Sequence, residues 1–70
     1  MTFTALIEPT RTGYSGHVVE LGGQVIAVGD TIDEVAQLLT EATEDIIHDL
    51  QRNGQPLPQA TATVRMLEIA

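Results

Sequence analysis

Hydrophobic residues form short β-type runs in the first part of the chain and recur with helical spacing in the middle. Thr2–Glu8 is the first β-rich stretch, and the polar turn PTRTG at 9–13 follows it. Two more such stretches run from Tyr14 to Leu21 and from Gln24 to Val28, with Gly22-Gly23 between them as a tight hairpin signal. Strands joined by such short turns predict an antiparallel meander.

A long amphipathic helix is predicted after the third strand. Thr31 and Glu34 form a capping box, in which the hydroxyl accepts from the backbone N–H three residues on and the glutamate reaches back. Asn53-Gly54 is a left-handed stop, and the prolines at 56 and 58 prevent the helix from resuming. The apolar residues between these ends have the spacing of one helix face: Ile32, Val35, Ala36, Leu39, Ala42, Ile46, Ile47 and Leu50.

Strand character returns at Thr61–Ile69. The predicted fold class is therefore α+β with the order β-β-β-α-β. It consists of a three-stranded antiparallel meander, one amphipathic helix and a C-terminal strand. The 70 residues form a single domain, 1–70.

The predicted strands do not alternate cleanly between apolar and polar residues. Val18 and Val19 are adjacent in the second strand, so apolar side chains fall on both faces of the sheet. Met66 and Leu67 repeat this pattern in the last strand. One helix covers only one face. A chain this short buries only about 60% of its unfolded surface, and this one has no cysteine for a disulfide. We therefore expect a homo-oligomer in which a second copy covers the other face or an edge.

The net charge of −7, with three arginines and no lysine, narrows the range of partners. It argues against direct nucleic-acid binding, which needs Lys and Arg to neutralise phosphates. It favours a basic protein partner. The first residues, MTFTALIEPT, lack the features of a signal peptide, and no apolar run approaches the ~20 residues of a membrane span. We expect no membrane association and a cytoplasmic location.

Most of the negative charge lies on the predicted helix. Six acidic residues and one arginine fall between Ile32 and Arg52, which gives this segment a net charge of −5. We predict that part of this face contacts a basic partner, and simple solvation of the face is the open alternative. The predicted contact residues are Glu41, Glu44, Asp45 and Asp49.

Three patterns invite a chemical interpretation, and each has a simpler one. The Gly-rich segment at 22–35 lacks the glycine spacing and the lysine of phosphate-binding loops, so we interpret it as a turn, a strand and a helix cap. His48 shares a helix face with acidic residues three and four positions before it, but bundle metal sites repeat the Glu-x-x-His pair. Ser15 and His17 lie about 6.6 Å apart along a strand, too far for a nucleophile–base pair. We predict no metal, no cofactor and no enzyme.

Five short motifs follow one another along the chain: Gly13-Tyr14, Leu21–Gln24, Gly29–Val35, Glu41-Ala42 and Asn53–Pro58. In this order and spacing the chain resembles the N-terminal domain of HicB-family antitoxins. That family has Gly-Tyr at the second strand, a turn of the type L-P-G-C, then G-[DE]-T-[LI]-x-E-A, then E-A-[IL], and an ending like D-G-x-P-[IL]-P. The P-G-C of the turn is Gly-Gly-Gln here, so any role of that cysteine is absent.

The resemblance implies a partial RNase H-like fold without the RNase H catalytic carboxylates. It also implies a cytoplasmic prokaryotic protein that oligomerises and neutralises a small basic HicA-like RNase toxin by covering its RNA-binding and catalytic surface. Most such antitoxins continue into a DNA-binding domain. This chain ends at Ala70, so we do not expect it to bind an operator by itself.

Two alternatives to the antitoxin function differ in class. The first is a solitary HicB-like structural or regulatory oligomer that binds a small ligand or an unrelated protein and has no toxin. The second is an RNase H-type nuclease, which requires clustered carboxylates on strands. Only Glu8, Glu20 and Glu68 are available there, without a matching set, which disfavours the nuclease.

Overall fold

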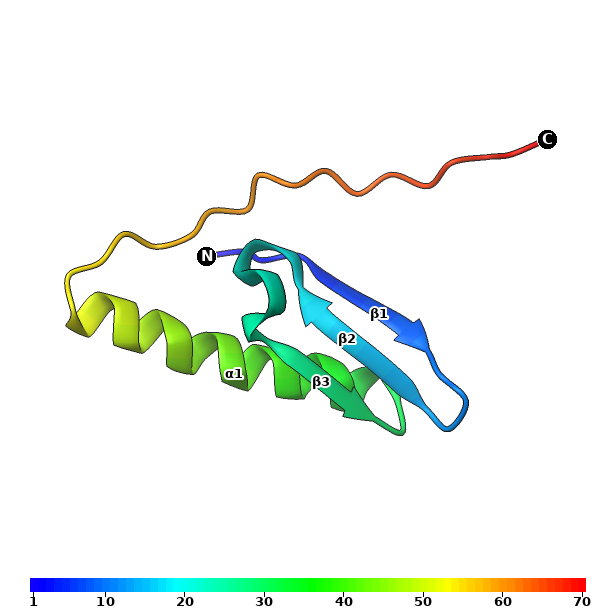
Figure 1. Ribbon diagram of the computed structural model, residues 1–70, viewed down its shortest axis with the longest axis horizontal. Helices are drawn as coiled ribbons and strands as arrows, with labels where there is room; N and C mark the ends of the chain where they lie inside the picture. The colour runs from blue at the N-terminus through cyan, green and yellow to red at the C-terminus, as the bar shows by residue number, and fades with distance from the viewer.

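A three-stranded antiparallel sheet and one long helix form the folded part of the protein (Figure 1). The structure is a computed structural model that describes residues 1–70. The strand order is β1-β2-β3, where β1 is Ala5–Pro9, β2 is Tyr14–Val18 and β3 is Ile26–Gly29. The helix α1, Ile32–Arg52, packs on one face of this sheet. The meander and the helix predicted from the sequence are therefore confirmed.

The register of the sheet decides which side chains face α1. Ile7 lies opposite Gly16 in the pairing of β1 with β2, and Gly16 lies opposite Ala27 in the pairing of β2 with β3. This row faces the helix so closely that a Cβ at Gly16 would lie 2.9 Å from Cγ1 of Val35. Side chains alternate along a strand, so the neighbouring row points away from the helix. This open face of the sheet consists of Leu6, Glu8, Ser15, His17, Ile26 and Val28.

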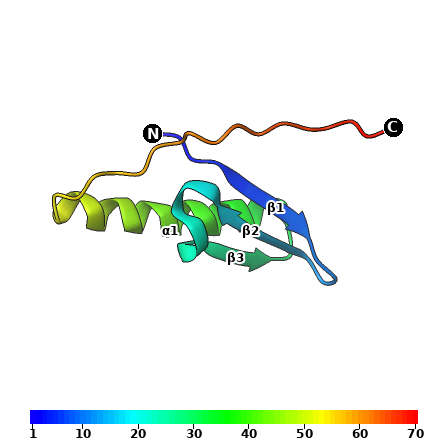
Figure 2. The same ribbon diagram turned by 45° about the horizontal axis from the view of Figure 1, so that its top comes forward.

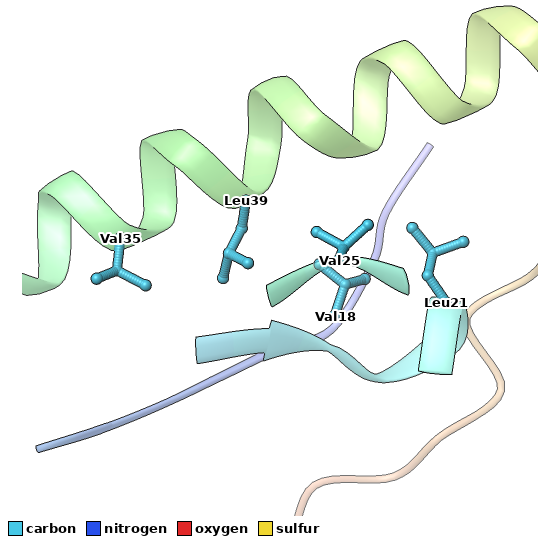
Figure 3. Packing of buried hydrophobic residues seen from close by; sticks show 5 residues of the cluster. All are labelled: Val18, Leu21, Val25, Val35 and Leu39. Carbon is cyan, nitrogen blue, oxygen red and sulfur yellow. The ribbon is translucent and has the colours of Figure 1, made fainter. Parts of the chain in front are cut away.

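The hydrophobic core is small. Figure 3 shows its five buried residues: Val18, Leu21, Val25, Val35 and Leu39. Val35 and Leu39 come from α1 and point at the residues contributed by β2 and the segment before β3. Only seven of the 70 residues are buried, so the single chain encloses little apolar surface for its length.

The N-terminus of α1 is capped as the sequence predicts, but by one half of the capping box. The Thr31 hydroxyl accepts a hydrogen bond from the Glu34 backbone N–H at 3.1 Å. The Glu34 carboxylate does not bond back to Thr31. It lies beside Gly29, where an added Cβ would come within 2.9 Å of its Oε1. Because Gly29 has no side chain, the Glu34 side chain in the first turn of α1 has room to lie beside it.

The C-terminus of α1 ends in a Schellman motif. The backbone N–H of Gln55 donates to the carbonyl of Leu50 at 2.9 Å, and that of Gly54 donates to the carbonyl of Gln51 at 3.2 Å. Gly54 has φ 66°, the left-handed conformation that glycine adopts without steric cost. The predicted Asn53-Gly54 stop is confirmed.

The connection between β2 and β3 is not the predicted hairpin. β2 ends at Val18 instead of Leu21, and Val19–Gln24 forms a 3₁₀ segment, η1. Leu21 turns into the core, and the Glu20 carboxylate accepts a hydrogen bond from the Thr4 backbone N–H at 2.7 Å. Because Glu20 and Leu21 make these tertiary contacts, they do not continue β2. β3 accordingly starts at Ile26, two residues later than predicted.

The strand ends shift at the start of the chain as well. β1 begins at Ala5, not Thr2, because its pairing with β2 starts where Ala5 lies opposite Val18. Before that point the Thr4 carbonyl accepts from the Val19 backbone N–H at 2.9 Å. Thr4 is therefore hydrogen-bonded to η1 and does not belong to the regular pairing of β1 with β2.

Residues 55–70, which we call the C-terminal tail, contain no helix or strand. The predicted strand at Thr61–Ile69 is not formed in the single chain: the segment runs extended and every residue from 59 to 70 is exposed. The tail lies on the same side of the molecule as β1 in two views (Figures 1 and 2). A strand needs a neighbour for its backbone hydrogen bonds, and the sequence of the segment alone cannot supply one.

Candidate functional site

The four acidic residues predicted to contact a partner lie together on the outer side of the second half of α1. Glu41, Glu44, Asp45 and Asp49 are all exposed. Their spacing of three and four residues places them on neighbouring turns. The core residue Leu39 occupies the opposite side of the helix. The structure thus brings these residues into one patch, which we call the acidic surface.

Little in the structure neutralises the acidic surface. Nη2 of Arg52 lies 3.3 Å from Oδ1 of Asp49, but the two side chains are 76% and 70% exposed. Such a pair contributes only about 0–1 kcal/mol. The Gln37 amide donates to Oε1 of Glu41 at 3.2 Å, and this contact adds no positive charge. The negative field of the patch is therefore directed at solvent.

Leu38 places an apolar side chain next to these acidic residues, at the N-terminal end of the patch. It precedes Glu41 by three residues and Asp45 by seven, so it shares their helix face. Its side chain is 40% exposed. Apolar groups surrounded by charged ones are typical of protein interfaces, where the charged rim orients the partner. Sequence reasoning missed Leu38, although a leucine outside the apolar stripe of the helix was a usable signal.

The two histidines have no chemical partners. His48 is exposed on α1, and the chain contains no group of three or more His, Cys, Asp and Glu side chains that could hold a metal ion. Ser15 and His17 both belong to the open face of the sheet, and no hydrogen bond joins them. The pair has no third group to orient it, so the geometry offers no nucleophile–base arrangement.

The open face of the sheet carries exposed apolar side chains. Leu6, Ile26 and Val28 are 39%, 66% and 68% exposed. Leu6 and Ile26 flank His17 on the sheet's outer side, because each pairs with it, and Val28 follows Ile26 by two residues on β3. The sequence predicted apolar residues on both faces, and the structure shows that α1 leaves this one uncovered.

A groove runs between the N-terminal residues 1–5 and the middle of α1, and we call it the β1 groove because it ends at Ala5, the first residue of β1. It is an open cavity of about 270 Å³. The Thr43 hydroxyl, in a residue only 8% exposed, points into the buried region without a hydrogen-bond partner. Sequence reasoning missed this groove, although small residues at Ala36, Thr40 and Thr43 were its signal on the helix. Its lining is Met1, Phe3, Ala5, Val18, Ala36, Leu39, Thr40, Thr43 and Glu44.

Glu20 holds the N-terminal segment against η1. Its Oε1 accepts from the Thr4 backbone N–H at 2.7 Å, and this hydrogen bond lowers the pKa of the carboxyl below its ordinary value of 4.5. Burial acts in the opposite direction and is the smaller effect. Oε2 of the same carboxylate is buried without a partner. Glu20 therefore has a structural role in attaching the N-terminal segment.

Comparison of the chain with family models, curated proteins and solved structures gave no match. The only helix, α1, is too polar to cross a membrane.

Proposed function

We propose that this protein is a non-enzymatic, HicB-like antitoxin module that oligomerises and neutralises a small basic HicA-like RNase toxin by binding it. The observation that carries the proposal is the acidic surface on α1, with Glu41, Glu44, Asp45 and Asp49 exposed together. A toxin that binds RNA has a basic surface for the phosphates. A protein that presents an equivalent negative surface competes for that same region.

The distribution of charge supports binding over catalysis. Complementary potentials speed the encounter of two proteins and disfavour wrong partners. Leu38, exposed at the N-terminal end of the acidic surface, supplies an apolar contact beside it. The same net charge of −7 disfavours binding of nucleic acid by this chain itself.

Two of the HicB-like motifs lie at the two ends of α1. Gly29–Val35 carries the chain from β3 into the capped start of α1, and Asn53–Pro58 carries it out through the Schellman motif. We take this as support for a partial RNase H-like arrangement in which Thr61–Ile69 supplies the fourth strand once it finds an edge to pair with. A cytoplasmic location belongs to the same proposal.

Co-expression with the small basic protein encoded by the neighbouring gene tests the proposal. We expect the chain to restore growth of a host that expresses the toxin and to co-purify with it. The matched variants are Glu41→Gln/Asp45→Asn, within the acidic surface, and Glu8→Gln/Asp30→Asn, outside it. Both remove two negative charges. We expect the first to slow association at low salt by on the order of tenfold and the second to have little effect.

Absence of a basic toxin-like gene nearby, together with failure to restore growth, would overturn the toxin proposal. Equal effects of the two double variants would show that overall charge acts, and not the acidic surface. A stable oligomer that neutralises no toxin would favour the alternative of a solitary HicB-like structural or regulatory oligomer. That alternative binds a small ligand or an unrelated protein.

A further inference from the structure

The single chain leaves more surface exposed than a closed domain of its mass. Its accessible surface is 5571 Å², whereas compact monomers of this mass expose about 4,200 Å². Its radius of gyration is 13.6 Å, against about 11 Å for a compact chain of 70 residues. The excess of about 1,300 Å² exceeds the ~800 Å² that each partner buries in a standard interface.

Much of the excess lies on the C-terminal tail. Val64, Met66, Leu67 and Ile69 are between 62% and 90% exposed. Leaving such side chains in water is unfavourable, and burial of each contributes about 1.5–3 kcal/mol. The tail is therefore a strand-like segment that lacks the surface it would pack on.

The first residues of the tail nevertheless lie against the body of the molecule. Leu57 and Pro58 are half-buried, and they line a hollow together with Leu50 of α1 and Leu21 of η1. Pro56 and Pro58 hold the backbone extended, because proline fixes φ. The tail thus leaves the body at a defined place as a straight arm, on the β1 side of the sheet (Figures 1 and 2).

The β1 groove has the properties of a site for one added strand. β1 is an edge strand, since it pairs only with β2, and its outer backbone groups have no partner in the sheet. Phe3 and Leu39 give the groove an apolar floor, and the unpaired Thr43 hydroxyl lies at its wall. A strand placed along β1 would cover the apolar floor of the groove.

Charge favours the tail as the occupant. Residues 55–70 contain one arginine and one glutamate, so the net charge of −7 lies entirely on residues 1–54. Two bodies of this charge repel each other, and the neutral tail is the part of the chain that approaches another copy without that cost. Val64 and Met66 share one side of the extended tail with Glu68 at its end, whereas Arg65 shares the other side with Leu67 and Ile69.

We infer that two copies of the chain exchange tails: Thr61–Ile69 of each copy pairs along β1 of the other and inserts Val64 and Met66 into the β1 groove. Each copy gives one strand and receives one, so the assembly closes as a twofold dimer. The exchange enlarges the five-residue core of each copy, which is small for an independent domain. It rests on the proposed oligomerisation but not on toxin binding.

Mixed labelling of the full chain tests the exchange. A dimer is prepared from one ¹³C,¹⁵N-labelled copy and one unlabelled copy, and filtered NOEs are recorded between the two. We expect a dimer by light scattering and intermolecular NOEs from the methyl groups of Val64 and Met66 to Phe3. A monomer whose tail contacts its own β1 would overturn the inference. So would a dimer with no intermolecular NOE from the tail.

A matched pair of tail variants measures the same contact energetically. Val64→Asp places a charge on the groove side of the tail, and Thr63→Asp places the same charge on the opposite side. We expect Val64→Asp to raise the dimer dissociation constant at least about 100-fold, because a charge would be taken out of water. Thr63→Asp should change it by no more than about threefold. Equal effects of the two variants would contradict the inferred strand orientation, and the NOEs remain decisive if Val64→Asp fails to fold.

Failure of this inference and failure of the proposed function are separable. A tail-exchanged dimer that does not neutralise a toxin supports the exchange and removes the antitoxin function. A chain that neutralises the toxin as a monomer supports the antitoxin function and removes the exchange. A dimer that persists in Val64→Asp retains the proposed oligomerisation and rejects the exchange.

Discussion

The body, residues 1–54, and the C-terminal tail both carry strong secondary-structure signals, but only the body satisfies them internally. α1 bonds its own backbone and is closed at both ends by local motifs, the Thr31 cap and the Gly54 stop. The tail has a β-type sequence of similar clarity, yet it remains an unpaired extended segment. Helical hydrogen bonds are local, whereas a strand depends on a neighbour that is distant in sequence or belongs to another chain.

This difference separates two kinds of surface on the same molecule. The acidic surface on α1 is exposed and charged, and water solvates it well without a partner. The tail and the β1 groove expose mainly apolar side chains, which water solvates poorly, and Glu44 lies where the groove meets the acidic surface. We therefore expect the tail and the β1 groove to be covered permanently by protein. We expect the acidic surface to bind its partner reversibly, with an affinity that falls as salt is added.

The largest expected effect tests which leucine of α1 belongs to the hydrophobic core of the body. Leu39 is 2% exposed and Leu38, its neighbour, is 40% exposed. Leu39→Ala should lower the free energy of unfolding by about 2–5 kcal/mol, because it removes buried methyl groups and leaves a cavity. Leu38→Ala should cost less than about 1 kcal/mol. Urea unfolding followed by circular dichroism measures both, and a similar loss in the two variants would contradict the assignment of the core.

A smaller effect tests how closely α1 packs on the sheet. A Cβ at Gly16 would lie 2.9 Å from Cγ1 of Val35 and 3.0 Å from the Leu6 carbonyl oxygen. Gly16→Ala should therefore destabilise the fold by about 1–3 kcal/mol through overpacking. Gly23→Ala is the control, since nothing lies within 4 Å of its added Cβ. Full tolerance of Gly16→Ala would show that the helix can move away from β2, and the body would then be less rigid than its contacts indicate.

The smallest effect concerns the attachment of β1 to the rest of the body. The hydrogen bond from Thr4 lowers the pKa of Glu20 in the folded state. A group with a lowered folded pKa contributes stability above its unfolded pKa, near 4.5, and this contribution is lost as the pH falls through the folded pKa. Urea midpoints measured from pH 7 to pH 3 should therefore converge for the wild type and Glu20→Gln at the acid end. A constant gap between the two curves would assign the effect to the amide itself.

The parts that could be predicted from the sequence are those with local causes. The capping hydroxyl of Thr31 and the glycine at 54 predicted both ends of α1, because caps act within one turn. The acidic surface was predicted for the same reason, since helical spacing alone places residues three and four apart on one face. The end of β2 was mispredicted, because Leu21 leaves the strand to fill a core built from distant residues.

The sequence by itself therefore determined the order of the three strands and the helix, the caps of that helix and the position of its negative charge. Only the tertiary structure decided that η1 replaces the hairpin, that a groove opens beside β1 and that the tail finds no partner in its own chain. The physical reason is the sequence separation between the residues that interact. Periodicity and capping are set by residues within a few positions, whereas a groove and a strand edge exist only once residues far apart in the chain have packed.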